Sequence, residues 1–293
     1  MRRGAVLVAV LVLVAMAGMV AAGLLFRMHA TVAASAAIGN GEQAYLAAMS
    51  GIQRAMDVLQ TSAASEAAWS DNPDLFRNQL VCDDGASRWY FTIYAPGDAG
   101  GQQRYGLVRE SDKTNINIAA KTRLLALGLT DEQADCLIDY RDRVPGGPEV
   151  TEPNGAEQDY YDRLPYPYLI PNFWFTTLEE LLLVKGFNAA IVYGEDTNFN
   201  GLLEPNEDDG DDSFPPDDRD GSLNVGLRNR ATVYGPNTFR VQCIGFGVPC
   251  GRIRVLEAVI DASAAPRILY LRDITRLGVP VSLDVESQEK TAG

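Results

Sequence analysis

The strongest chemical signal in the sequence is a run of oxygen-bearing side chains in DTNFNGLLEPNE, residues 196–207. Calcium loops of the EF-hand type place oxygen ligands at positions 1, 3, 5, 7, 9 and 12, with glycine at position 6 for the sharp turn. Gly201 occupies position 6 here. The ligand positions fall on Asp196, Asn198, Asn200, the carbonyl of Leu202, Glu204 and Glu207. The spacing therefore predicts a bound calcium ion.

More carboxylates follow directly, because residues 195–220 contain eleven acidic residues and one basic residue. Asp217, Asp218 and Asp220 could hold a second calcium ion or complete the first site. The alternative for both segments is a solvated acidic run. Since the loop contains Pro205 and is followed by many acids in place of a long helix, we expect a structural ion and not a switch. Without a cation, repulsion between the carboxylates predicts a loosely ordered region.

Other site chemistries are excluded by what the sequence lacks. The only histidine, His29, lies at the end of the apolar run, so His-dependent hydrolysis and His-based zinc sites are excluded, and no CxxC motif exists. A net charge of −14 argues against a nucleic-acid partner. Cys243 and Cys250 bracket a glycine-rich turn and could form a disulfide, the alternative being buried thiols. The lone histidine therefore excludes most common hydrolase chemistries.

The N-terminus carries a membrane signal. It reads MRRGAVLVAVLVLV, and the 23 residues from Gly4 to Phe26 contain no charge. At about 1.5 Å per residue this run spans a hydrocarbon core of ~30 Å. Arg2 and Arg3 predict a cytoplasmic N-terminus and an exported remainder. A cleaved secretory signal ending near Ala22 is the alternative, which would release an exported calcium-stabilised binding protein.

The elements that must position the loop can be read from periodicity. Residues 30–62 predict a continuation of the apolar helix, with a stripe for packing on a sheet at Leu46, Met49, Ile52, Met56 and Leu59. Gly39 and Gly41 are expected to weaken this helix locally. Residues 87–96 and 104–111 predict one hairpin, residues 238–247 and 252–261 a second, and residues 267–273 a further strand.

Between the two groups of strands, residues 112–228 predict helices and loops. Residues 117–129, 130–143 and 176–187 form the expected helices, and Thr130 with Gln133 is a capping-box start for the second. Strands on both sides of a helical block indicate a helical domain inserted into a sheet. The fold class is therefore α+β: a long N-terminal helix packed on an antiparallel sheet, with a large inserted all-helical domain.

The segment LLALGLTDEQADCLIDYRDR also resembles a helix-hairpin-helix, a fold often used on the DNA backbone. This leaves a membrane-anchored DNA receptor as an alternative function. Asp131 and Glu132 stand where phosphate would dock, however, and no basic stripe accompanies them. A helical scaffold is the interpretation that these charges favour.

Taken together, these segments resemble general secretion pathway protein K, the large minor pseudopilin family of the type II secretion system. Three segments carry the resemblance over nearly the whole chain: RRG followed by the apolar run, DKTNINIAAKTRLLALGLTDEQADCLIDYRDR, and YDRLPYPYLIPNFWFTTLEELLLVKGF. The resemblance implies a prepilin leader cut after Gly4, with Ala5 as the first mature residue. Most pilins carry glutamate at the fifth mature position. That position is Ala9 here, and members of the protein K family also lack this glutamate.

The resemblance also implies a division of the chain and a role. Residues 1–4 would be the leader, 5–29 the transmembrane part of the helix, 30–111 the pilin-like helix and first strands, 112–228 the inserted domain, and 229–293 the returning strands. The processed protein would sit in the inner membrane with its bulk in the periplasm. It would join minor pseudopilins of the I and J types at the pseudopilus tip. It would be a substrate of the prepilin peptidase and not itself an enzyme.

Overall fold

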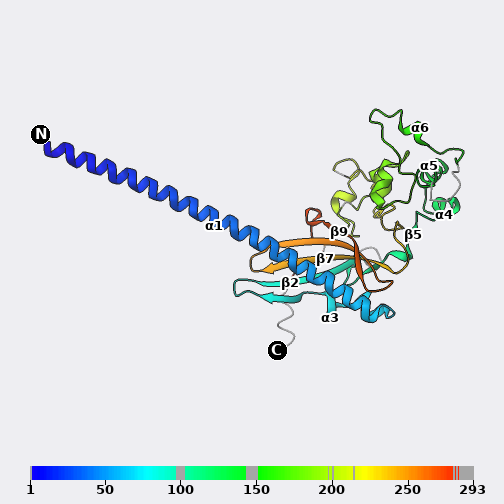
Figure 1. Ribbon diagram of the computed structural model, residues 1–293, viewed down its shortest axis with the longest axis horizontal. Helices are drawn as coiled ribbons and strands as arrows, with labels where there is room; N and C mark the ends of the chain where they lie inside the picture. The colour runs from blue at the N-terminus through cyan, green and yellow to red at the C-terminus, as the bar shows by residue number, and fades with distance from the viewer. Residues whose placement is uncertain are drawn as a thin grey trace.

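The computed structural model describes residues 2–96, 103–142, 151–196, 198–199, 201–213 and 215–279, with residues 281 and 283. One helix, α1 (Arg2–Ser62), runs for 61 residues and projects far beyond the rest of the molecule (Figure 1). Residues 10–36 are exposed along their whole length. Within the described residues, one helix is long and apolar enough to cross a membrane, and it is this one.

The second half of α1 lies across the sheet, and full burial begins at Ala44. The helix predicted over residues 30–62 is confirmed. Gly39 and Gly41 do not interrupt it, since the helical backbone is continuous through both. Two short helices follow, α2 (Glu66–Trp69) and α3 (Pro73–Phe76), and the Asn72 side chain caps the second.

The sheet is antiparallel along its main path, in the order β1-β2-β7-β8-β9. The predicted strands at 87–96, 238–247, 252–261 and 267–273 are confirmed. The structure adds an unpredicted edge strand, β1, whose side chains are mostly exposed. The bounds are β1 (Gln79–Asp83), β2 (Arg88–Pro96), β7 (Thr238–Val248), β8 (Ile253–Asp261) and β9 (Arg267–Asp273).

The predicted hairpin partner over residues 104–111 is only partly correct. It divides into β3 (Gln103–Arg104), which pairs with β2, and β4 (Val108–Arg109), which pairs with β7. A short 3-10 helix, η1 (Glu110–Asp112), then leads into the inserted domain. The chain thus changes its strand partner here, because β2 and β7 are neighbours in the sheet.

Close contact between α1 and the sheet depends on glycine. A Cβ at Gly245 of β7 would lie 2.0 Å from the carbonyl oxygen of Ala44, and one at Gly51 would lie 2.3 Å from Cys243 Sγ. The core beneath the helix includes Ile52, Phe91 and Val241. Burial of these apolar side chains is the main favourable term that fixes the helix on the sheet.

The inserted domain has its own core, which includes Leu124, Leu137, Tyr140, Tyr161 and Leu181. The second predicted helix is α5, and its capping box between Thr130 and Gln133 is confirmed. The elements are β5 (Thr114–Asn115), α4 (Lys121–Ala126), α5 (Asp131–Arg141), α6 (Gln158–Tyr161), η2 (Leu178–Leu183), α7 (Ala189–Tyr193), η3 (Pro205–Glu207) and β6 (Ala231–Thr232). A last 3-10 helix, η4 (Thr275–Leu277), follows β9.

Two details of the prediction for this domain need correction. The domain is not all-helical, because β5 and β6 form a parallel pair where the chain enters and leaves it. The segment 176–187 forms the 3-10 helix η2 and not an α-helix. Of its leucines only Leu181 is fully buried, while Leu182 and Leu183 are 39% and 49% exposed. Short helices depend on tertiary packing for their stability. Because this segment packs through few side chains, packing does little to stabilise a longer helix here.

Candidate functional site

The segment 196–207 forms a compact loop directly after α7. Its first and last predicted ligands are buried, with Asp196 3% and Glu207 1% exposed. The backbone N–H of Gly201 donates to Asp196 Oδ2 at 2.9 Å, and Gly201 has the positive φ, +70°, that the motif requires. The loop is thus closed on its own first carboxylate, as expected for a calcium loop.

The later ligand positions also face inward. The Asn198 side-chain amide donates to Glu204 Oε2 at 2.8 Å, and the Glu204 backbone N–H donates to Glu207 Oε2 at 3.2 Å. Asn200 lies outside the described residues. Two buried carboxylates within one tight loop are costly unless a cation or hydrogen bonds compensate them. The described donors are hard oxygens of the kind that calcium binds. Among the described residues, however, the three carboxylates whose oxygens lie within 4.8 Å of one another are Asp139, Asp142 and Glu157, and not those of this loop. The calcium ion and the carbonyl ligand of Leu202 therefore stay predictions.

The three aspartates predicted for a second ion bond chiefly to their own loop. Asp217 accepts from the backbone N–H groups of Asp209, Gly210 and Arg219. Asp218 accepts from the N–H of Asp220, and Asp220 from that of Ser222. A second calcium ion there stays a prediction.

These aspartates nevertheless act on the start of the first loop. Burial raises the pKa of Glu195, and the charges of Asp218, Asp217 and Asp220 act in the same direction. A hydrogen bond from the Asn224 backbone N–H opposes this shift. The charges of these aspartates thus disfavour ionisation of Glu195, the residue before the first predicted ligand.

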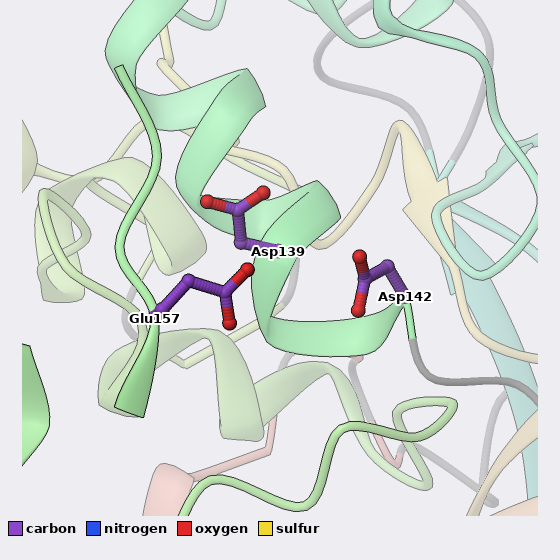
Figure 2. Close-up of side chains that lie close together, drawn as sticks. All are labelled: Asp139, Asp142 and Glu157. Carbon is purple, nitrogen blue, oxygen red and sulfur yellow. The ribbon is translucent and has the colours of Figure 1, made fainter. Parts of the chain in front are cut away.

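A carboxylate cluster that sequence reasoning missed lies at the end of α5. Figure 2 shows Asp139 and Asp142 at the C-terminal end of that helix and Glu157 on the segment before α6. One oxygen from each lies within 4.8 Å of the others, a spacing that could hold a cation. The i, i+3 spacing of Asp139 and Asp142 was the available signal, but Glu157 joins them only through the fold.

The cluster changes the pKa of Asp139, its buried member. Burial raises the pKa of Asp139 to about 6, and the charges of Glu157 and Asp142 add to the increase. The backbone N–H of Glu152 donates to Asp139 Oδ1 at 2.9 Å and acts in the opposite direction. The pKa of Asp139 therefore lies well above the ordinary value of an aspartate.

A buried ion network joins the inserted domain to the sheet. Arg240 on β7 bonds Glu110 at 2.7 Å and Glu257 at 2.9 Å, and Lys113 also bonds Glu110 at 2.7 Å. Arg228, near the end of the inserted domain, pairs with Glu257. The network escaped prediction, although charged residues inside otherwise apolar strands were a usable signal.

The predicted disulfide between Cys243 and Cys250 is wrong for this structure, in which both are free thiols. Cys243 lies against Gly51 under the middle of the α1 contact. Cys250 packs instead on Ala44, Ala47 and Trp89. The two cysteines therefore pack near different turns of α1.

A comparison with known protein families supports the resemblance for part of the chain. Residues 105–193 match the family described as "Type II secretion system (T2SS), protein K". A chain of the GspK-GspI-GspJ complex from the type 2 secretion system of enterotoxigenic Escherichia coli is similar in structure, with a TM-score of 0.49 and 13% identity. The likeness covers 82% of this chain and 98% of that one. None of the curated proteins matches the chain in sequence.

Proposed function

We propose that this chain, which carries the type II secretion protein K domain over residues 105–193, is a minor pseudopilin at the tip of a secretion pseudopilus. The observation that carries the proposal is the combination of that domain with α1. The exposed apolar helix would anchor the chain in the membrane and contact other subunits of the filament. The inserted domain, which contains most of the matched residues, would distinguish this subunit from the other pseudopilins. Its role is assembly for protein export across the outer membrane.

The first half of α1 supports processing and anchoring. Residues 10–36 expose an apolar surface that no described segment of the chain covers. Such a surface is stable only in lipid or against other helices. Before assembly the segment would lie in the inner membrane, with the bulk of the chain in the periplasm. Cleavage by the prepilin peptidase after Gly4 would leave Ala5 as the N-terminal residue, which we expect to be methylated.

Two features support a position at the tip. Ala9 leaves no carboxylate at the fifth mature position to pair with the amine of a subunit above it. An unpaired carboxylate in lipid is costly, so its absence suits a subunit without such a neighbour. The inserted domain also stands beyond the far end of the sheet from the N-terminus (Figure 1), where it would obstruct a further subunit. We therefore place I- and J-type minor pseudopilins below this chain.

The first test is the mature N-terminus, measured by mass spectrometry of protein from cells that contain a prepilin peptidase. We expect a start at Ala5 for the natural sequence and a start at Met1 for Gly4→Leu. Gly18→Leu is the matched control and should be processed normally, since a side chain at Gly18 meets nothing within 4 Å. A natural chain that starts near Gly23 would overturn the pseudopilin assignment.

The second test addresses the tip role separately. The full chain in detergent is purified with I- and J-type pseudopilins in calcium. Copurification of both partners is the expected result. Correct processing at Gly4 without any association would overturn the tip position while leaving the pseudopilin assignment intact.

A further inference from the structure

Two buried aspartates lie one turn apart on the same face of α5. Asp135 and Asp139 are both 0% exposed, and each accepts hydrogen bonds from the segment that precedes α6. Residues four apart on a helix share one face, so the two carboxylates occupy equivalent positions. A comparison of their partners shows which of the two buried charges the domain compensates.

Asp135 is well compensated. Lys121 pairs with its carboxylate, and Asn154 donates to Asp135 Oδ2 through the backbone N–H at 3.2 Å and the side-chain amide at 3.0 Å. Burial would raise the pKa of Asp135, but these partners outweigh it and hold the pKa below its usual value. The domain therefore keeps this aspartate ionised in its interior.

Asp139 lacks equivalent partners. It accepts one hydrogen bond, at Oδ1 from the Glu152 backbone N–H, and its Oδ2 has no hydrogen-bond donor among the described residues. Gly155 leaves room for this oxygen, because a Cβ at that position would overlap Oδ2. The strongest charges that act on Asp139 are all negative and come from Glu157, Asp142 and Glu152. An ionised carboxylate buried in this way is costly without a cation.

The acids beside Asp139 are spaced as the ligands of one ion would be. One oxygen each from Asp139, Asp142 and Glu157 lies within 4.8 Å of the others, and Figure 2 shows the Asp142 and Glu157 side chains pointing toward one another. Calcium–oxygen distances are about 2.4 Å, so oxygens on opposite sides of one calcium ion are about 4.8 Å apart. The three oxygens therefore fit within a single calcium coordination sphere.

The helix end adds to the excess of negative charge. Asp142 is the C-cap residue of α5, where the negative end of the helix dipole disfavours a carboxylate. The neighbouring Arg141 interacts with Asp142 and offsets one of the negative charges. Arg141 also donates to the Ala119 carbonyl, and within the described ranges no lysine or arginine forms an ion pair with Asp139.

We propose that Asp139, Asp142 and Glu157 bind a calcium ion at a site separate from the 196–207 loop. The ion would supply the positive charge that a lysine supplies to Asp135. Because two ligands belong to the end of α5 and Glu157 is the N-cap residue of α6, the ion would also join these two helices. Water would complete the six to eight oxygens that calcium takes.

This site should bind calcium more weakly than the loop. It offers three carboxylates, whereas the loop has six predicted ligand positions, and affinity depends on the number, charge and rigidity of the ligands. We expect a Kd of about 0.1–1 mM, in the range of weak extracellular sites. At micromolar calcium the cluster would be empty, and measurements of stability would report on the loop alone.

The test is isothermal titration calorimetry of the full chain in detergent, with calcium chloride added at constant ionic strength. We expect a saturable phase with a Kd of about 0.1–1 mM in the natural chain, which Asp139→Asn and Glu157→Gln both lose. Asp196→Asn should keep this phase, which separates the cluster from the loop. Absence of the phase in the natural chain, or its persistence in either cluster variant, would overturn the proposal.

Asp159→Asn is the matched control, because it removes the same charge from an exposed residue that pairs with Arg163. It should keep the weak phase. If it loses the phase as Asp139→Asn does, calcium responds to net charge and the assignment fails. Thermal unfolding in chelator checks that Asp139→Asn is folded, since removal of an uncompensated buried charge should not lower its melting temperature. Glu157→Gln, at a half-buried residue, gives a second and independent test of the site.

Discussion

The ring of Phe199 lies on the guanidinium of Arg228, with 3.6 Å between Arg228 Cζ and the ring centroid. Phe199 belongs to the proposed calcium loop and has a positive φ of +61°. Arg228 pairs in turn with Glu257, which is fully buried on β8. The loop is thereby joined to the sheet through one aromatic contact and one buried ion pair. Any cation that orders the loop would also order this connection.

Removal of calcium should destabilise the protein, because buried carboxylates in the loop would lose their cation. We expect a chelator to lower the melting temperature of the natural chain, and Asp196→Asn to abolish that calcium-dependent difference. Asp159→Asn, in an exposed ion pair with Arg163, should keep it. Differential scanning calorimetry with and without calcium measures the effect. An unchanged melting temperature of the natural chain in chelator would contradict the calcium site.

Phe199→Leu should weaken the link between the loop and the sheet. Leucine keeps an apolar side chain but removes the aromatic face, so a cation–π contact of about 1–2 kcal/mol is lost. Phe173→Leu is the control, since the Phe173 ring is 43% exposed and contacts Trp174. Urea unfolding of both variants gives the comparison. Equal losses of stability would show that the Arg228 contact adds nothing.

Acid should destabilise the protein through Glu110. Burial alone would raise the pKa of Glu110, but Arg240 and Lys113 outweigh it and lower the pKa from 4.5 to about 2. An acid with a depressed folded-state pKa contributes stability above its unfolded pKa and loses it as pH falls. We therefore expect loss of stability between about pH 4.5 and 2. Glu110→Gln should be less stable at pH 7 and should flatten this loss. Glu42→Gln, exposed on α1, should follow the natural curve.

Asp139 should give the opposite pH dependence. Its folded-state pKa of about 6 exceeds the ordinary value of 3.8, so the folded state binds the proton more tightly. Stability contributed in this way is present below about pH 4 and declines as pH rises to about 6. Asp139→Asn should remove the decline, measured by thermal unfolding in chelator. The substitution Asp159→Asn, at an exposed residue, should retain the decline of stability with pH. If Asp139→Asn shows the same decline as the natural chain, the assignment to Asp139 is wrong.

Gly245→Ala should disrupt the contact between α1 and β7. Its Cβ would stand 2.0 Å from the Ala44 carbonyl oxygen and 2.4 Å from the Ala48 backbone nitrogen, so the helix must shift. Overpacking of this kind costs about 1–3 kcal/mol. Gly235→Ala is the control, because a Cβ there meets nothing within 4 Å. Urea unfolding should separate the two variants, and equal stabilities would mean that the helix contact is looser than the structure indicates.

Much of the fold could be predicted because its signals are local. The apolar run and the stripe at Leu46, Met49, Ile52, Met56 and Leu59 predicted the course of α1, and strand-like runs separated by turns predicted β2, β7, β8 and β9. The capping box at Thr130 and Gln133 required only residues three apart. The correction to residues 176–187 has the opposite origin, since the burial of Leu181 and the exposure of Leu182 and Leu183 depend on the tertiary packing.

The sequence by itself determined the spacing of the 196–207 loop, because consecutive ligands on one tight loop need no partner from elsewhere. Tertiary structure alone decided the junction. Glu110 and Arg240 are 130 residues apart in sequence, and they meet because β4 pairs with β7. It likewise decided that Cys243 and Cys250 pack near different turns of α1, and that Glu157 reaches Asp139. Periodicity specifies which face of an element is apolar, whereas a buried charge acquires its partner only when distant elements are packed together.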